Sequence, residues 1–166
     1  MKTPANLAEA FAGESQANRR YLAFGEAAAK EGLAQVSRLF RAVAAAETIH
    51  AHSHLRALGG VKATLDNLQA AIDGEKHEFE EMYPEFVAAA EAEGDRRAAL
   101  SMRNAMAVEK VHHGLFSAAL DAVKDGHDLP TAAIHVCEVC GHTVIGDAPD
   151  RCPICNAKGE KFAAID

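Results

Sequence analysis

Two short stretches of this 166-residue chain decide its fold: Glu47-Thr48-Ile49-His50 and Glu109-Lys110-Val111-His112. Each is a Glu-x-x-His pair, and each follows a lone upstream glutamate, Glu14 in the first case and Glu75 in the second. Residues three apart lie on one face of a helix, so each pair can present a carboxylate and an imidazole to one point. Two helices with one glutamate and two with Glu-x-x-His form the ligand set of a dinuclear carboxylate metal site in a four-helix bundle.

The sequence around these motifs repeats as well. Asn6-Leu7 leads to Gly13-Glu14, and Asn67-Leu68 leads to Gly74-Glu75, so the lone glutamates are 61 residues apart. Packing alone can repeat a pattern of apolar residues, but it does not require repeated carboxylates and imidazoles. The repeat therefore predicts two similar helical hairpins related by an approximate two-fold axis.

The apolar periodicity predicts a mainly α protein with four long helices. We expect the first, second and fourth helices over residues 4–31, 33–58 and 95–124. The third helix should end at Gly94 and is interrupted at Tyr83-Pro84, where proline should kink or restart it. Residues 61–71 are expected to be a stretched connection, because about ten extended residues span roughly the 30 Å needed to cross along a bundle. The predicted fold class is a four-helix bundle over residues 1–130, followed by a small four-cysteine metal domain over residues 131–166.

The two Glu-x-x-His glutamates are framed by small apolar residues, Ala42-Val43-Ala44-Ala45-Ala46 before Glu47 and Ala105-Met106-Ala107-Val108 before Glu109. Carboxylates in such surroundings are expected to be buried, and a buried charge needs a partner. The alternative, a solvated charged face, does not explain this framing. From their positions, Glu47 and Glu109 can bridge two metals, His50 and His112 can bind at opposite ends, and Glu14 and Glu75 can each add a terminal carboxylate.

Glu78 breaks the symmetry of the repeat. It lies one helical step from Glu75, and its counterpart in the first repeat is Ala17. A seventh ligand on one side would give one metal a choice of partners, whereas the alternative is a carboxylate outside the ligand set. The chain has only two tyrosines, Tyr21 and Tyr83, and both are near the predicted ligands in sequence, where they can hydrogen-bond to a carboxylate or simply pack in the core.

All four cysteines lie near the end of the chain, in the pairs Cys137-x-x-Cys140 and Cys152-x-x-Cys155. This spacing predicts a tetrahedral thiolate site for iron or zinc. Gly141 and Asn156 follow the two pairs and tolerate the left-handed turn that directs amides to the sulfurs. Iron would serve as an electron relay beside a dinuclear site, whereas zinc would only stabilise the fold.

Composition excludes several partners. The net charge is −7 and no basic block occurs, so nucleic acid is not an expected ligand. No apolar run approaches the roughly 20 residues that span a bilayer, and the first 20 residues carry Glu9, Glu14, Arg19 and Arg20 rather than the apolar stretch of a secretory signal. We therefore expect a cytoplasmic protein that does not enter membranes.

Together these motifs resemble the rubrerythrins. The resemblance rests on Gly13-Glu14-Ser15-Gln16-Ala17, on Glu47 to His52, on Gly74 to Glu78 with Met82-Tyr83-Pro84-Glu85-Phe86, and on Glu109 to His112, while the cysteine segment resembles rubredoxin. It implies a ferritin-like bundle with a non-haem di-iron site, oxo-bridged in one form, and one iron on four cysteines. His142 and Asn156 depart from the usual rubredoxin pattern.

The resemblance also implies roles. One iron would be held by Glu14 and Glu78 and the other by Glu75 and His112, with Glu47 and Glu109 bridging. Glu78 and His50 would exchange as ligands when the oxidation state changes. Together with Tyr21 and Tyr83, which lie near the ligands in sequence, they are the candidate catalytic residues.

The activity that this family resemblance implies is reduction of hydrogen peroxide during oxidative stress. Electrons would come from an NAD(P)H-linked reductase or a rubredoxin. Dimers would be antiparallel, or part of a higher homo-oligomer, with each four-cysteine domain near the partner's site. Two alternatives stay open: a ferroxidase or iron-storage protein, and a non-enzymatic metal-binding module with structural zinc.

Overall fold

The computed structural model describes residues 2–165 of the chain. Contacts within the chain form two compact units, one that ends at Lys62 and one that begins at Ala63. No helix among the described residues combines the length and the apolar character that crossing a bilayer would require.

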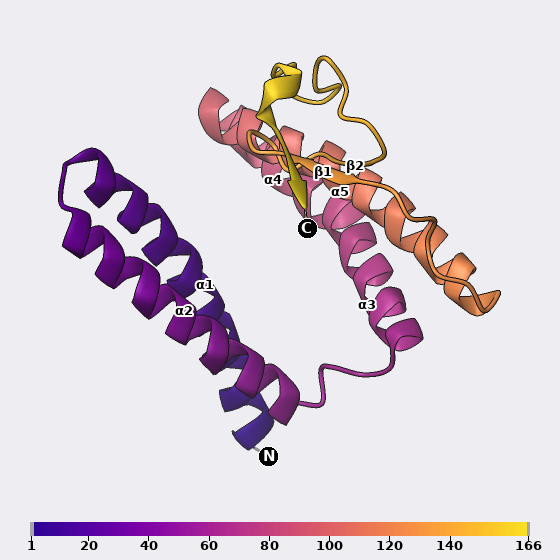
Figure 1. Cartoon of the computed structure of the whole chain (residues 1–166), viewed down its shortest axis with the longest axis horizontal. Coiled ribbons are helices and arrows are strands. Elements are labelled where there is room, and N and C mark those ends of the chain that lie inside the picture. The colour runs from indigo at the N-terminus through magenta and orange to yellow at the C-terminus, as the bar shows by residue number, and fades with distance from the viewer. Residues whose placement is uncertain (1, 166) are drawn as a thin grey trace. The chain divides into compact units, whose positions relative to one another are not determined.

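The first unit is a hairpin of two helices, α1 (Lys2–Lys30) and α2 (Ala34–Ala57), which lie side by side along their length (Figure 1). Small residues let them approach closely. A Cβ built on Gly25 would lie 3.4 Å from the carbonyl oxygen of Ser37 on the other helix. Asn18 links the helices, since its Nδ2 donates to the Ala44 carbonyl oxygen at 2.7 Å and to Thr48 Oγ1 at 2.8 Å.

The second unit begins with a second hairpin. Helix α3 (Thr64–His77) continues through a π-helical segment η1 (Glu78–Met82) into α4 (Tyr83–Ala92), and this composite helix packs against α5 (Arg96–Lys124). Asp95 caps α5, because its Oδ1 accepts from the backbone N–H groups of Arg97 and Ala98 at 3.1 and 2.9 Å. The predicted hairpin pairing and the restart at Tyr83-Pro84 are confirmed.

Two sequence-based boundaries differ. The expectation that residues 61–71 form a stretched connection is wrong, because α3 already begins at Thr64. Leu65, Leu68 and Ile72 follow at helical spacing, and Asp66 favours the first turn through the helix dipole. The first helix begins at Lys2 rather than residue 4, so Thr3 and Pro4 lie within its first turn, where a missing N–H costs no hydrogen bond.

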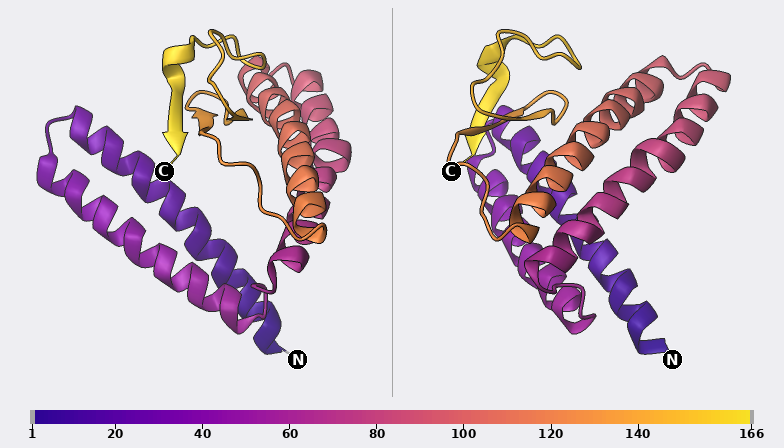
Figure 2. Two further views of the ribbon diagram at one scale, coloured as in Figure 1. Left: turned by 45° about the vertical axis from the view of Figure 1, so that its right-hand side comes forward. Right: turned by 90° about the vertical axis from the view of Figure 1, so that its right-hand side faces the viewer.

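The chain ends in a three-stranded antiparallel sheet, with strand order β2-β1-β3. The strands are β1 (Ile134–Cys137), β2 (Thr143–Ile145) and β3 (Phe162–Ile165), and a 3₁₀ turn, η2 (Gly159–Lys161), precedes β3. We refer to residues 131–165 as the four-cysteine segment. Figure 2 shows this segment beside α5, and β2 contacts that helix directly.

Candidate metal centres

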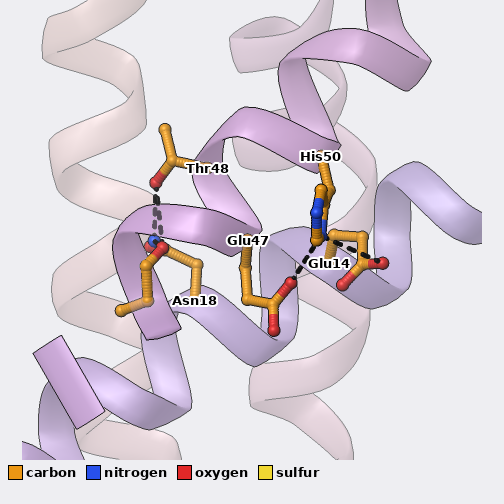
Figure 3. Close-up of polar contacts among 6 residues, drawn as sticks. Glu14, Asn18, Glu47, Thr48 and His50 are labelled. Carbon is orange, nitrogen blue, oxygen red and sulfur yellow. Dashed lines mark hydrogen bonds and ion pairs between the residues drawn. The ribbon is translucent and has the colours of Figure 1, made fainter. Parts of the chain in front are cut away.

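The first cluster of candidate ligands lies on the α1–α2 hairpin and consists of Glu14, Glu47 and His50 (Figure 3). One turn of α2 brings His50 back over Glu47, so His50 Nδ1 lies 2.9 Å from Glu47 Oε2. Glu14 reaches the same point from α1, with its Oε1 4.0 Å from that nitrogen. Two carboxylates and one imidazole from two helices therefore meet at one place.

The second cluster lies on the α3–α5 hairpin and consists of Glu75, Glu109 and His112. His112 Nδ1 lies 2.8 Å from Glu109 Oε2 and 3.9 Å from Glu75 Oε2. The corresponding distances in the first cluster are 2.9 and 4.0 Å, so the sequence repeat is also a repeat of side-chain geometry. The two clusters lie in different units, and their union in one dinuclear site stays a prediction.

Hydrogen bonding around His112 fits a cation at Nδ1. Its other nitrogen, Nε2, lies 3.0 Å from Thr143 Oγ1, and that hydroxyl donates to the Gly141 carbonyl oxygen at 3.1 Å. The hydroxyl has one hydrogen, so it accepts from Nε2–H, and a neutral imidazole then turns its Nδ1 lone pair toward Glu109. A cation at Nδ1 would be stabilised by the Glu109 carboxylate oxygen, which lies 2.8 Å away.

The second cluster also carries uncompensated negative charge. Glu75 Oε2 is buried without a hydrogen-bond partner among the described residues. Burial raises the pKa of Glu75, and the nearby Glu109 carboxylate raises it further. Carboxylates and imidazole together suit iron or manganese, so the donor set fits the predicted metal.

Glu78 and Tyr83 stand at the two ends of the π-helical segment. The Tyr83 N–H donates to the Glu78 carbonyl oxygen, five residues back, which is the bond that defines a π turn. Burial raises the pKa of the Glu78 carboxyl, and Glu75 adds to that rise. Burial likewise raises the pKa of the Tyr83 hydroxyl, and the carboxylates of Glu109, Glu78 and Glu75 raise it further. The charges of the second cluster therefore act on both side chains. Glu78 is not one of the three residues that converge there.

Tyr21 lies in an aromatic group rather than in a polar one. Its ring centroid is 6.4 Å from that of Phe24 and 6.2 Å from that of Phe40, and Phe24 and Phe40 contact each other edge to face at 5.7 Å. The predicted role of Tyr21 beside the ligands therefore stays a proposal. The role of Tyr83 has electrostatic support.

The four cysteines converge at one point, as their spacing predicts. The Sγ atoms of Cys137 and Cys155 are 3.7 Å apart, those of Cys140 and Cys152 are 3.6 Å apart, and none forms a disulfide. A tetrahedral metal with bonds of about 2.3 Å to sulfur places its sulfurs roughly 3.8 Å apart, so the pocket fits such an ion.

The turns around the cysteines favour a thiolate at Cys152. Gly141 has φ +85° and Asn156 has φ +60°, which confirms the left-handed turns expected after each pair. Burial alone would raise the pKa of Cys152, but the backbone N–H groups of Cys155 and Ile154 outweigh it and lower that pKa to about 7. Burial raises the pKa of Cys140, so without a cation this thiol keeps its proton.

His142 is a buried polar residue in the four-cysteine segment. Its ring lies edge to face with Phe162 at 6.1 Å, in the place of an aromatic side chain, and its Nδ1 has no hydrogen-bond partner among the described residues. Burial lowers the pKa of His142, and His112 lowers it further, so the ring is neutral and packs like an aromatic residue.

Sequence reasoning missed the contact between the four-cysteine segment and α5. Thr143 reaches His112 across 31 residues of sequence, and a Cβ built on Gly141 would lie 3.8 Å from Val108 on α5. A cavity of about 530 Å³, lined mainly by apolar side chains of α3, α5 and the four-cysteine segment, adjoins Thr143 and His112. The resemblance implied a contact with a partner's site, which stays a prediction, whereas this contact lies within one chain.

Comparisons with known proteins agree with this architecture. The Rubrerythrin family model matches residues 5–120, and the model for the rubredoxin-like domain of rubrerythrin matches residues 135–163. Rubrerythrin-2 of Clostridium acetobutylicum is 36% identical, over 96% of this chain and 94% of its own length. Nigerythrin of Nitratidesulfovibrio vulgaris is 34% identical, over 96% of this chain and 84% of its own.

Solved structures of nigerythrin extend the likeness to the fold. Its partially reduced state matches with a TM-score of 0.59 at 32% identity, covering 98% of this chain and 86% of that chain. Its fully reduced state, in which all the irons are ferrous, matches with a TM-score of 0.59 at 31% identity. The predicted fold class, a ferritin-like helical domain with a C-terminal rubredoxin-like domain, is confirmed, and so is iron as the expected cofactor.

Proposed function

Because this chain belongs to the rubrerythrin family, we propose that it reduces hydrogen peroxide to water at a di-iron site, in the cytoplasm, with electrons from an NAD(P)H-linked reductase or a rubredoxin. The single observation that carries this proposal is the matched pair of Glu, Glu, His clusters, whose distances agree within 0.1 Å. A structural role does not require such matched ligands. The chain is an oxidoreductase in the broad sense of its family, and peroxide as its substrate is our inference.

The proposed ligand set joins the two clusters with Glu78. Glu14 and Glu78 would hold one iron, Glu75 and His112 the other, and Glu47 and Glu109 would bridge, while Cys137, Cys140, Cys152 and Cys155 would hold the third iron. When bound there, two ferrous ions would supply together the two electrons that, with two protons, convert one peroxide to two waters, which would avoid a one-electron path to hydroxyl radical.

The side chains have distinct tasks in this scheme. Burial raises the pKa values of Glu75 and Glu78, so these carboxyls hold a proton more readily than exposed ones, and a bound cation would favour their ionised forms. Tyr83, with its raised pKa, keeps its hydrogen and can donate it to peroxide or to a carboxylate. The exchange of Glu78 for His50 would follow the preference of the oxidised metal for oxygen and of the reduced metal for nitrogen.

The test is an anaerobic single turnover. The iron-loaded protein is reduced, hydrogen peroxide is added in steps, and the oxidation of iron and the loss of peroxide are followed together. We expect one peroxide consumed for each di-iron site. Reduced protein that consumes none would remove the peroxidase proposal, and oxygen-driven accumulation of an iron mineral would favour the storage alternative instead.

The variant Glu78→Ala has a matched control on the same π-helical segment. Glu81 is exposed and pairs with His77 at 3.1 Å. Glu78→Ala should leave iron bound but slow turnover at least about tenfold, whereas Glu81→Ala should change neither. Equal rates in both variants would remove the proposed role of Glu78.

A further inference from the structure

The contact between β2 and α5 contains one hydrogen-bonded chain that no packing requirement explains. His112 Nε2 lies 3.0 Å from Thr143 Oγ1, and Thr143 Oγ1 donates to the Gly141 carbonyl oxygen at 3.1 Å. Gly141 follows Cys140 directly, and its own N–H donates to the Cys137 carbonyl oxygen at 2.8 Å. The cysteine turn, the hydroxyl and the imidazole are therefore connected without a gap.

We propose that Thr143 is a positioning residue that fixes the tautomer and the orientation of His112, so that the four-cysteine segment of a chain prepares the metal ligand on its own α5 helix. The inference rests on the proposed function only in taking His112 as a metal ligand.

The direction of each hydrogen bond follows from the number of hydrogens available. Threonine has one hydroxyl hydrogen, and the Gly141 carbonyl can only accept it. His112 must then donate through Nε2–H, which leaves the Nδ1 lone pair directed at Glu109 and Glu75. Metal-binding histidines commonly donate their second N–H to a protein oxygen in this manner, and loss of that partner weakens metal binding by about 10- to 100-fold.

The acceptor is held rigidly. Gly141 has φ +85°, a conformation that other residues rarely adopt, and its turn lies against the buried Val108 on α5. Thr143 itself is fixed in the sheet, where it pairs with Val136 of β1. The hydroxyl therefore cannot follow the imidazole if His112 rotates, and it determines where the ring lies.

Without the hydroxyl, His112 has a better alternative. In metal-free protein, moving the hydrogen from Nε2 to Nδ1 would let the ring donate to Glu109 Oε2, only 2.8 Å away. Thr143 opposes that change, because the Nε2–H bond would be lost, and the hydroxyl could donate to the bare Nε2 only by giving up its bond to the Gly141 carbonyl oxygen. The hydroxyl thus keeps the metal-binding nitrogen free of hydrogen before any metal arrives.

The first experiment measures the tautomer directly. Full-length chain with zinc on the cysteines and no metal at the carboxylates is labelled with ¹⁵N, and the ring nitrogens of His112 are assigned by NMR at mildly alkaline pH, where imidazole is neutral in water. We expect Nε2–H in the wild type and in Thr143→Ser, which retains the hydroxyl. Thr143→Val should shift His112 to Nδ1–H. An unchanged tautomer in Thr143→Val would overturn the proposal.

The second experiment measures metal affinity by titration with Mn²⁺ on the same zinc-loaded chain. Thr143→Val should bind at least about tenfold more weakly, and Thr143→Ser should recover most of the loss. Thr131→Val makes the same chemical change at an exposed threonine outside the contact and should leave affinity unchanged. Equal losses in the Val and Ser variants would show a packing effect and would also overturn the proposal.

Both readouts are independent of turnover. A chain that fails to consume peroxide but shows the tautomer change keeps this inference and loses the proposed function. A chain that consumes peroxide, with His112 and Mn²⁺ affinity unaffected by Thr143→Val, keeps the function and loses this inference.

Discussion

The second cluster predicts an unusual pair of effects for Glu75→Gln: the metal-free protein should become more stable while its metal affinity falls. Glu75 and Glu109 are only 20% and 16% exposed, and their ligand oxygens lie within 4.8 Å of each other. At an effective dielectric constant of about 20, two unit charges at that distance repel by about 3.5 kcal/mol. Burial raises the pKa of Glu75 and the Glu109 carboxylate raises it further, so proton uptake by Glu75 can relieve part of this repulsion.

We therefore expect a realised gain of about 1–2 kcal/mol in the free energy of unfolding at pH 7. The glutamine amide does permanently what a proton on Glu75 does temporarily, because it removes the charge and offers a donor to Glu109. The same change deletes a ligand oxygen, so Mn²⁺ affinity should fall at least about tenfold.

The assay is urea unfolding of full-length chain with zinc on the cysteines and the carboxylates free of metal, combined with calorimetric titration of Mn²⁺. The matched control is Glu91→Gln. Glu91 Oε1 has a partner, Arg103 Nη1, at 2.6 Å, and both side chains are about half exposed. This control should lose at most about 1 kcal/mol and keep its metal affinity. If Glu75→Gln destabilised the metal-free protein as Glu91→Gln does, Glu75 would already have a cationic partner and the charge argument would fail.

Three further changes test the fold and its electrostatics. Asn18→Ala removes two hydrogen bonds between α1 and α2 and should lower the free energy of unfolding by about 2–3 kcal/mol in a urea titration, so a loss below about 0.5 kcal/mol would contradict the role of this amide. Burial and then Glu75 raise the folded-state pKa of Glu78 above its ordinary 4.5, so the unfolded chain releases this proton first as pH rises. Stability of the metal-free protein should therefore fall above about pH 4.5, and Glu78→Gln should flatten that fall in unfolding curves between pH 5 and pH 7. Gly159→Ala would place a Cβ 2.6 Å from the Pro149 carbonyl oxygen, so a chelator should remove metal from the cysteines faster, and an unchanged release rate would show that the loop can move aside.

Local signals explain why most helix boundaries could be predicted from the sequence. Gly32, Gly94 and Gly126 all have positive φ just after helices. Helices commonly end with a residue in this left-handed conformation, and glycine adopts it most easily. Asp95 caps the helix that follows it, as expected. These features depend on neighbouring residues alone, so the helix ends they mark can be predicted from the sequence.

The start of α3 was missed for a different reason. The expectation that residues 61–71 are stretched came from the distance that a connection was assumed to span, and not from the residues themselves. Leu65 and Leu68 carry the helical spacing that the structure follows. A global assumption therefore overrode a local signal that was correct.

The π-helical segment could be predicted only in part from the sequence. Pro84 predicts a break because it lacks an N–H, but it does not specify that one extra residue will be accommodated at Glu78–Met82. Packing of α3 and α4 against the same helix, α5, keeps both parts of the composite helix in place. Glu78 and Tyr83 lie at the two ends of this segment, and Glu75 raises the pKa values of both in addition to burial.

The sequence repeat, and the residues that depart from it, indicate how two clusters with the same ligand geometry can differ in function. The ligand distances match within 0.1 Å, so a difference in behaviour between the two metals has to come from residues outside the repeat. Glu78, Tyr83 and Thr143 are such residues, and all three lie in the unit that begins at Ala63. In the proposed ligand exchange one metal would move and the other would stay, and a hydroxyl fixed in a sheet would favour the metal on His112 as the one that stays. In that proposal symmetric ligands would bind the pair, and the asymmetric surroundings would give each metal its role.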